Sequence, residues 1–95
     1  METMQLRQIA AAVGAECGED RPITDVVTDT AQVTPGSLFV ALKGERFDGH
    51  DFIPKAAEAG AAAVLSEKPL DAGIPVLEVP STRKALVELA RYYRG

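Results

Sequence analysis

One segment of the chain gathers several side chains that could bind a small molecule. Residues 43–51 read Lys-Gly-Glu-Arg-Phe-Asp-Gly-His-Asp and hold two glycines, a guanidinium, an aromatic ring, carboxylates and the only histidine of the protein. Arginine forms charge-assisted hydrogen bonds to anions, an aromatic ring packs on flat rings, and glycine lets the backbone approach a ligand closely. This mixture predicts a ligand with a flat ring, hydroxyl groups and some negative charge.

Other uses of the same residues stay open. Phe47 could stack on a base or fold back onto the core, and Arg46 could bind phosphate or pair with a neighbouring carboxylate. His50 could act as a general base, but the acidic residues beside it favour an orienting or capping role. A small hydrolase using Asp29, Asp48 and His50 is a further alternative, although nothing in the sequence fixes the distances between these groups.

The sequence lacks the common signatures of several catalytic sites. It contains no G-x-x-x-x-G-K-[ST] phosphate loop, no G-x-G-x-x-G after a strand, no H-E-x-x-H and no nucleophile elbow. We therefore expect no ATP site of a known arrangement in this chain, no metal site and no catalytic residue.

Length and composition predict one soluble globular domain. The chain has 95 residues, of which 46% are apolar and 25% are charged, and domains usually contain about 100 to 200 residues. Fourteen acidic residues against ten basic ones give a net charge of −4. This charge argues against nucleic acid or an anionic membrane surface as a partner.

The cysteine content and the absence of long apolar runs indicate a cytoplasmic protein. A single cysteine, Cys17, cannot form an intramolecular disulfide. The longest uninterrupted apolar runs, such as residues 61–65, are far shorter than the ~20 residues that span a bilayer, and no signal peptide is visible. We expect a cytoplasmic location and no membrane partner.

The elements that position the loop alternate between strand and helix. A first helix is predicted from Thr3, as the capping residue, to Gly14, with Leu6, Ile9, Ala10 and Val13 on one face. Residues 23–28 predict a strand, and the sequence Thr-Pro-Gly-Ser at 34–37 predicts a turn. Apolar runs at 38–42 and 61–65 predict buried strands.

Helices are expected between and after these strands. The first runs from about Phe52 to Gly60, with Asp51 as its cap, Pro54 in its first turn, and Ile53, Ala56 and Ala57 facing the core. A strand at 75–79 and a helix capped by Ser81 follow, the latter with Leu86, Leu89, Ala90 and Tyr93 on one face. Strand, helix and strand form a βαβ unit, so we expect an α/β fold with a mixed or parallel sheet and flanking helices.

One long stretch of the sequence carries a family resemblance. It reads Val27-Thr-Asp-Thr-Ala-Gln-Val-Thr-Pro-Gly-Ser-Leu-Phe-Val-Ala-Leu-Lys-Gly-Glu-Arg-Phe-Asp-Gly-His-Asp-Phe52. This stretch resembles the Mur ligases of peptidoglycan synthesis. The likeness continues through residues 60–65 and 82–90 and so covers nearly the whole chain. Within the family, the stretch is most similar to the branch that adds D-alanyl-D-alanine.

The resemblance implies that residues 1–95 form the N-terminal domain, which grips the UDP end of a UDP-N-acetylmuramoyl-peptide. It also implies an ATP-dependent parent enzyme, using Mg²⁺, whose central ATP-binding and C-terminal domains are absent from this chain. The chain alone would then be inactive, and its partners would be the UDP-linked peptide and the ligase's own central domain.

Position by position, the resemblance implies UDP contacts at Thr28, Thr30, Glu45, Arg46 and Phe47. It further implies that Gly44, Asp48, Gly49 and His50 shape the loop.

One residue departs from the family pattern. Ala31 follows Thr30 where the family usually has arginine. That arginine could form an ion pair that steadies the loop or could help hold the pyrophosphate, and the loss of either charge-assisted contact would weaken UDP binding. A stand-alone module that senses nucleotides or binds proteins remains the alternative to a ligase domain.

Overall fold

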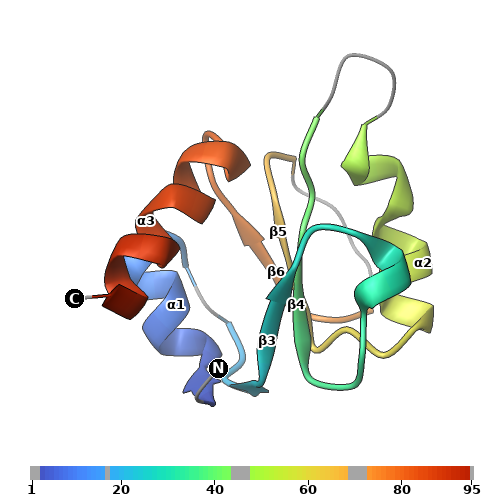
Figure 1. The fold of residues 1–95 in the computed structure, drawn as a ribbon, viewed down its shortest axis with the longest axis horizontal. Coiled ribbons are helices and arrows are strands. Elements are labelled where there is room, and N and C mark those ends of the chain that lie inside the picture. Colours follow the sequence, from blue (N-terminus) through green and yellow to red (C-terminus); the bar gives the residue numbers. More distant parts are fainter. Residues whose placement is uncertain (1–2, 17, 44–47, 69–72, 95) are drawn as a thin grey trace.

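The computed structural model describes residues 3–16, 18–43, 48–68 and 73–94. Within these ranges, four parallel strands form a sheet in the order β3-β4-β5-β6. Helices lie on both faces of this sheet (Figure 1), so the predicted α/β class is confirmed. The strands are β3 (Asp25–Val27), β4 (Ser37–Val40), β5 (Ala63–Ser66) and β6 (Val76–Glu78).

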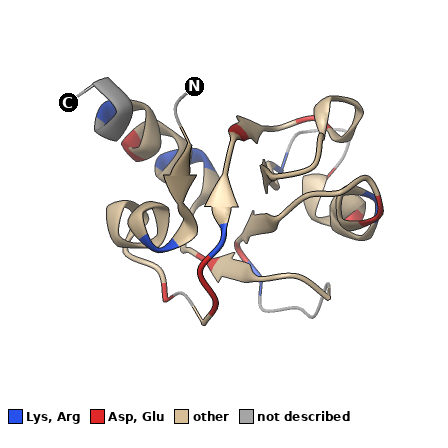
Figure 2. Ribbon diagram, turned by 90° about the horizontal axis from the view of Figure 1, so that it is seen from below, with Lys and Arg blue, Asp and Glu red and all other residues tan. Residues whose placement is uncertain are grey.

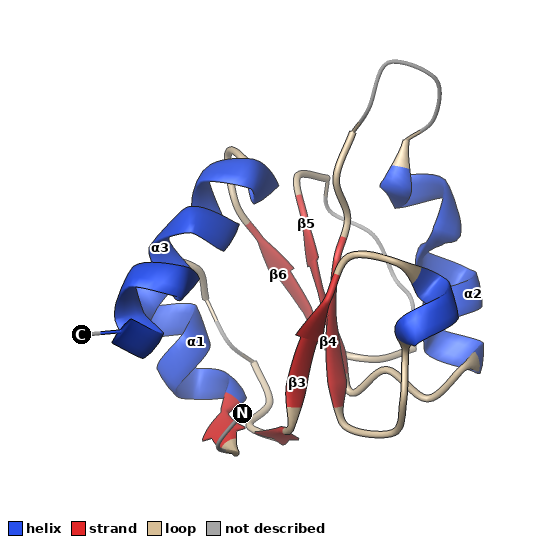
Figure 3. Cartoon of the chain, in the orientation of Figure 1, coloured by secondary structure: helices blue, strands red, loops and turns tan. Residues whose placement is uncertain are grey.

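The two faces of the sheet carry separate apolar cores. Helices α1 (Leu6–Val13) and α3 (Thr82–Arg94) pack together over one face, and α2 (Ile53–Glu58) covers the other (Figure 3). Along β4, Leu38 and Val40 enter the core under α1 and α3, whereas Phe39 enters the core under α2. This burial on both faces explains why the strand has no polar alternation.

The predicted βαβ unit is confirmed. Strand β4 leads through α2 to the parallel strand β5, with Leu38 paired to Ala63 and Val40 paired to Leu65. The predicted turn before β4 is also present, because the Ser37 amide donates to the Thr34 carbonyl at 3.0 Å. Gly36 has φ +93° in this turn, a conformation that glycine adopts without steric cost.

The first helix buries the predicted face but begins later than predicted. Its four predicted core residues are all buried, and Gly14 ends the helix with φ +74°. The cap is Gln5, which forms a reciprocal capping box with Gln8, so the assignment of Thr3 was wrong. The reason is that Met4 and Gln5 are held in an extended strand, β1, which pairs antiparallel with β2 (Pro22–Ile23).

The single strand predicted at 23–28 is two strands in two sheets. Ile23 ends β2, which pairs with β1, whereas Asp25 begins β3, which pairs with β4. Thr24 lies between them, and its amide donates to the Gly36 carbonyl at 3.0 Å. The chain therefore changes partners at Thr24.

The helix predicted from Phe52 begins with a short 3₁₀ turn. Turn η2 (Gly49–Phe52) precedes α2, and the Asp48 carboxylate caps it by accepting a hydrogen bond from the His50 amide. The prediction of Asp51 as the cap was therefore wrong. Pro54 lies in the first turn of α2, as expected, and Ile53 and Ala56 are buried while Ala57 is half-buried.

The last helix begins as predicted but presents a slightly different face. Ser81 accepts a hydrogen bond from the Lys84 amide at 3.2 Å, which is the predicted capping contact. Leu89 is buried, but Ala90 is exposed, contrary to the prediction. Thr82 and Ala85 are buried instead of Ala90, because the helix turns the face that carries Thr82, Ala85 and Leu89 toward the core. The side chain of Tyr93 lies outside the described part of the chain.

Ion pairs fasten the segment that leads into β2, where Figure 2 shows acidic and basic residues close together. Asp20 pairs with Arg7 of α1 at 3.6 Å, and Glu19 pairs with Arg21 at 3.1 Å. Exposed pairs of this kind contribute about 0 to 1 kcal/mol each.

Among the described helices, none has the length and apolar character needed to cross a membrane.

Candidate functional site

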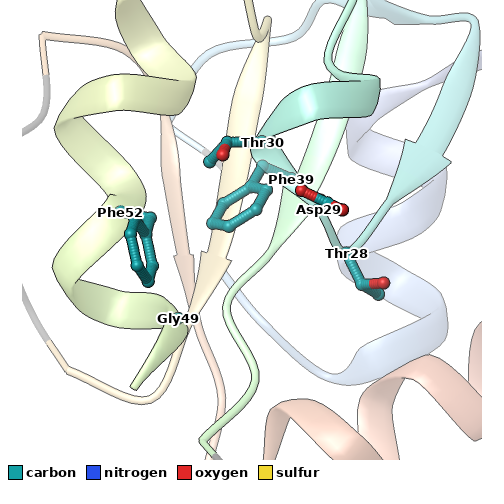
Figure 4. Close-up of a pocket in the computed structure, with 6 residues that line it drawn as sticks. All are labelled: Thr28, Asp29, Thr30, Phe39, Gly49 and Phe52. Atoms are coloured by element: carbon teal, nitrogen blue, oxygen red, sulfur yellow. The ribbon is translucent and has the colours of Figure 1, made fainter. Parts of the chain in front are cut away.

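A pocket of about 460 Å³ opens at the carboxyl ends of β3 and β4, on the face that carries α2 (Figure 4). Ligands of open α/β sheets bind beyond the carboxyl ends of the strands, and small-molecule pockets have volumes of about 300 to 1,000 Å³. The position and the size therefore make this pocket the candidate site. Its lining residues are Thr28, Asp29, Thr30, Phe39, Gly49 and Phe52.

The segment that follows β3 supplies the polar side of the pocket. Asp29 caps the short 3₁₀ helix η1 (Thr30–Gln32), because one of its carboxylate oxygens accepts a hydrogen bond from the Ala31 amide at 2.9 Å. This cap turns the chain directly after the strand, and Thr28 and Thr30, on either side of Asp29 in the sequence, line the pocket with it. The two hydroxyl groups can donate to and accept from a polar ligand, and the carboxylate can accept from it.

Two phenyl rings supply the apolar side. Phe39 comes from β4 and is 1% exposed, whereas Phe52 comes from η2 and is 39% exposed. In Figure 4 the Phe39 ring lies between the η1 and η2 sides of the pocket. Aromatic surface beside hydroxyl groups suits a ligand that combines a flat ring with polar substituents.

Gly49 forms the corner where the loop after β4 returns to the sheet. Its amide donates to the Leu42 carbonyl at 2.7 Å, and an antiparallel bridge joins Lys43 to Asp48. These contacts close the base of the loop. Cys17 and the predicted loop residues Gly44, Glu45, Arg46 and Phe47 lie outside the described residues.

His50 is buried and is bonded through both ring nitrogens. Nδ1 lies 2.5 Å from an oxygen of Asp48, and Nε2 accepts a hydrogen bond from the Glu67 amide at 2.9 Å. The His50 amide, the His50 ring and the Lys68 ammonium hold the pKa of Asp48 at about 2, below its ordinary 3.8, and outweigh the opposing effect of partial burial. The backbone hydrogen bond is the largest of these causes.

The structure does not bring Asp29, Asp48 and His50 together as the small hydrolase suggested by the sequence would require. Asp48 and His50 contact each other, but Asp29 bonds to the Ala31 amide at the other side of the pocket. Both nitrogens of His50 are already engaged within the protein, which leaves neither free to take a proton from a substrate. Within the described residues, no group of three or more potential metal ligands was found.

Sequence reasoning missed the two aromatic residues of the pocket. Phe39 was assigned to the strand core and Phe52 to the beginning of a helix, so neither was considered as a ligand contact. A usable signal was their position, since Phe39 is the penultimate residue of β4 and Phe52 follows the loop that leaves it. Both positions flank the edge of the sheet at which ligands bind.

A family model of known proteins matches most of the chain. The Mur ligase family, catalytic domain, matches residues 22–94. The chain belongs to the Mur ligase family. The expectation drawn from the motif at residues 27–52 is thereby confirmed.

Curated Mur ligases resemble the chain over its whole length. It is 47% identical over 95 residues to the UDP-N-acetylmuramoyl-tripeptide--D-alanyl-D-alanine ligase of Escherichia coli (strain K12), a match covering 99% of the chain and 21% of the relative. It is 38% identical over 95 residues to a UDP-N-acetylmuramoyl-L-alanyl-D-glutamate--2,6-diaminopimelate ligase of Listeria monocytogenes, and this match covers 100% of the chain and 19% of the relative. The Mur ligase chain therefore spans about a fifth of the length of these relatives.

Solved Mur ligase structures share its fold. A crystal structure of MurF from Acinetobacter baumannii matches with a TM-score of 0.91 and 34% identity, covering 99% of this chain and 22% of that one. The MurF ligase of Thermotoga maritima, solved in complex with ADP, matches with a TM-score of 0.67 and 40% identity over 72% of this chain and 16% of that one. This Mur ligase domain is thus a small parallel α/β unit.

Proposed function

We propose that this chain binds the UDP portion of a UDP-N-acetylmuramoyl-peptide, as the N-terminal domain of a ligase that adds D-alanyl-D-alanine in peptidoglycan synthesis. The observation that carries the proposal is the pocket at the carboxyl ends of β3 and β4, which is lined by both threonine hydroxyl groups and phenyl rings. The relative at 47% identity, whose name includes both the UDP-linked tripeptide and the dipeptide, supports the choice of substrate.

The chemistry of the pocket suits a uridine nucleotide. The hydroxyl groups of Thr28 and Thr30 can donate to a uracil carbonyl or exchange hydrogen bonds with ribose hydroxyls. We further propose that Glu45, Arg46 and Phe47 complete the site from the adjoining loop. In that arrangement the guanidinium would face the negative charge of the diphosphate, while Gly44, Asp48, Gly49 and His50 would shape the loop.

ATP and Mg²⁺ belong, in this proposal, to the part of the enzyme outside residues 1–95. The sequence here has no phosphate loop to cradle a triphosphate. A ligase of this kind would act in the cytoplasm and would bring its central ATP-binding domain against this one. We expect residues 1–95 alone to bind the nucleotide end of the substrate without turning it over.

Calorimetric titration of the chain tests the proposal directly. UDP and UDP-N-acetylmuramoyl tripeptide should both bind, and AMP, as the matched control, should bind much more weakly. The backbone amides of Thr28, Thr30, Gly49 and Phe52 should shift in a ¹H–¹⁵N NMR spectrum on addition of UDP. An equal response to AMP would favour a general nucleotide sensor, and no response to either uridine compound would contradict the proposal.

A further inference from the structure

We propose that His50 is a positioning residue, which holds the η2 wall of the pocket onto the end of β5. The inference deepens the proposed function, because the pocket that it concerns is the proposed UDP site. Gly49 and Phe52 both line that pocket, and His50 lies between them in the same 3₁₀ turn. Any movement of His50 therefore moves the pocket wall.

The hydrogen bonds determine which ring nitrogen carries the proton. The Glu67 amide can only donate, so Nε2 accepts at 2.9 Å and carries no hydrogen. The imidazole is then the neutral tautomer with its proton on Nδ1, where it donates to the Asp48 carboxylate. The side chain of His50 is only 4% exposed, so water does not compete for either hydrogen bond.

Asp48 is held in place by more than the histidine ring. The same carboxylate oxygen accepts a hydrogen bond from the His50 amide at 3.0 Å, and the other oxygen lies 3.5 Å from Lys68 Nζ. The Asp48 carbonyl also accepts from the Asp51 amide at 3.0 Å. These contacts fix Asp48 as the cap of η2, and the His50 ring can therefore turn only if the cap moves with it.

Glu67 uses two different groups to join two elements. Its backbone amide donates to His50, while its carboxylate accepts from the Thr82 amide at 2.9 Å and from the Thr82 hydroxyl at 3.1 Å. Thr82 is the first residue of α3 and is 1% exposed. One residue therefore connects the pocket wall to the helix on the opposite face of the sheet.

Variants can separate positioning from general stability. His50→Gln keeps an acceptor near the Nε2 site for the Glu67 amide, His50→Asn keeps a donor near the Nδ1 site for Asp48, and His50→Ala keeps neither. Thr82→Val is the matched control, because it removes the hydroxyl bond to Glu67 and leaves the His50 bonds intact.

The first readouts need no ligand. In the wild-type chain, ¹⁵N spectra of the histidine ring should show a protonated Nδ1 and an unprotonated Nε2. Amide hydrogen exchange at residues 49–52 should be about five- to tenfold faster in His50→Ala, because the variant loses both ring hydrogen bonds and the net contribution of each such bond is small. His50→Gln should recover part of this protection, and Thr82→Val should exchange there like the wild type while unfolding at a lower temperature.

UDP affinity is the second readout. It should fall about five- to tenfold in His50→Ala and stay unchanged in Thr82→Val. A protonated Nε2, unchanged exchange in His50→Ala, or equal effects of His50→Ala and Thr82→Val would overturn the inference. If the wild-type chain binds no UDP, the proposed function fails, while the tautomer and exchange results still decide the role of His50.

Discussion

Gly49 lies directly against the backbone of Leu42, at the point where the chain returns from the loop to the sheet. A Cβ atom at position 49 would lie 2.7 Å from the Leu42 carbonyl oxygen and 2.8 Å from the Leu42 nitrogen. Backbone atoms cannot rotate away as the end of a side chain can. The junction between β4 and the pocket wall therefore requires a residue without a side chain.

Replacing Gly49 with alanine should destabilise the domain by about 1 to 3 kcal/mol, as other overpacked sites do. The free energy of unfolding in urea measures the effect. Gly18→Ala is the control, because a Cβ there meets no atom within 4 Å, and its stability should stay within about 0.5 kcal/mol of the wild type. Equal stability of both variants would show that the junction can relax at no cost.

Thr30→Val should weaken UDP binding by roughly fivefold, the value of about one hydrogen bond, because it removes a pocket hydroxyl and keeps the shape of the side chain. The melting temperature should change little, since Thr30 is only half-buried. Thr3→Val, at an exposed threonine outside the pocket lining, should bind UDP like the wild type. A large loss of stability in Thr30→Val would assign the residue to structure instead.

Ala31→Arg should tighten UDP binding or leave it unchanged. Ala31 is exposed on η1, next to the pocket residue Thr30, so an arginine there has room beside the pocket. A restored charge-assisted contact would add about 1.5 to 3 kcal/mol, or roughly one to two decades in affinity. Ala31→Gln separates charge from length, and weaker binding by the arginine variant would contradict this account of the departure.

Acid should lower the free energy of unfolding of the domain through protonation of Asp48. The pKa of Asp48 is about 2 in the folded protein and 3.8 ordinarily, so between these values the unfolded chain binds the proton more readily. The contribution of Asp48 is therefore complete above pH 3.8 and is lost as the pH falls toward 2. Urea unfolding followed across this range should show a decline that Asp48→Asn reduces.

The asparagine variant is a suitable control because its side-chain oxygen can still cap η2 and it does not titrate in this range. Its stability above pH 3.8 should be lower than that of the wild type, and the two should converge toward pH 2. Parallel curves for the two proteins would mean that other carboxylates account for the acid sensitivity.

Local patterns were sufficient to predict much of the fold. Leu38 and Val40 belong to an apolar run without alternation, which indicates a strand buried on both faces. The Pro35-Gly36 pair indicates a turn with positive φ. These signals depend on neighbouring residues alone, and the structure confirms them.

Signals that depend on distant partners were misread. The strand at 23–28 is divided because Ile23 pairs with Met4 whereas Asp25 pairs with Ser37, and no residue type in the segment reveals this change. The wrong cap at Asp51 has a local cause instead, because hydrophobic periodicity does not distinguish a 3₁₀ turn from the helix that follows it.

The candidate site was predicted only in part. Thr28 and Thr30 after β3 and Gly49 after β4 line one pocket at the carboxyl edge of the sheet, where the rule for parallel strands places ligands. The link from His50 to Glu67 and Thr82 could not be predicted, since it joins residues separated by 17 and 15 positions. The contacts of residues 44–47 stay a prediction.

The contact between α1 and α3 also has a consequence for biosynthesis. The ribosome makes α1 well before α3, yet the two helices close the same apolar core. The apolar side chains of Leu6 and Ile9 therefore stay partly exposed to solvent until Leu89 has left the ribosomal exit tunnel. The domain can reach its native state only after its last helix has emerged.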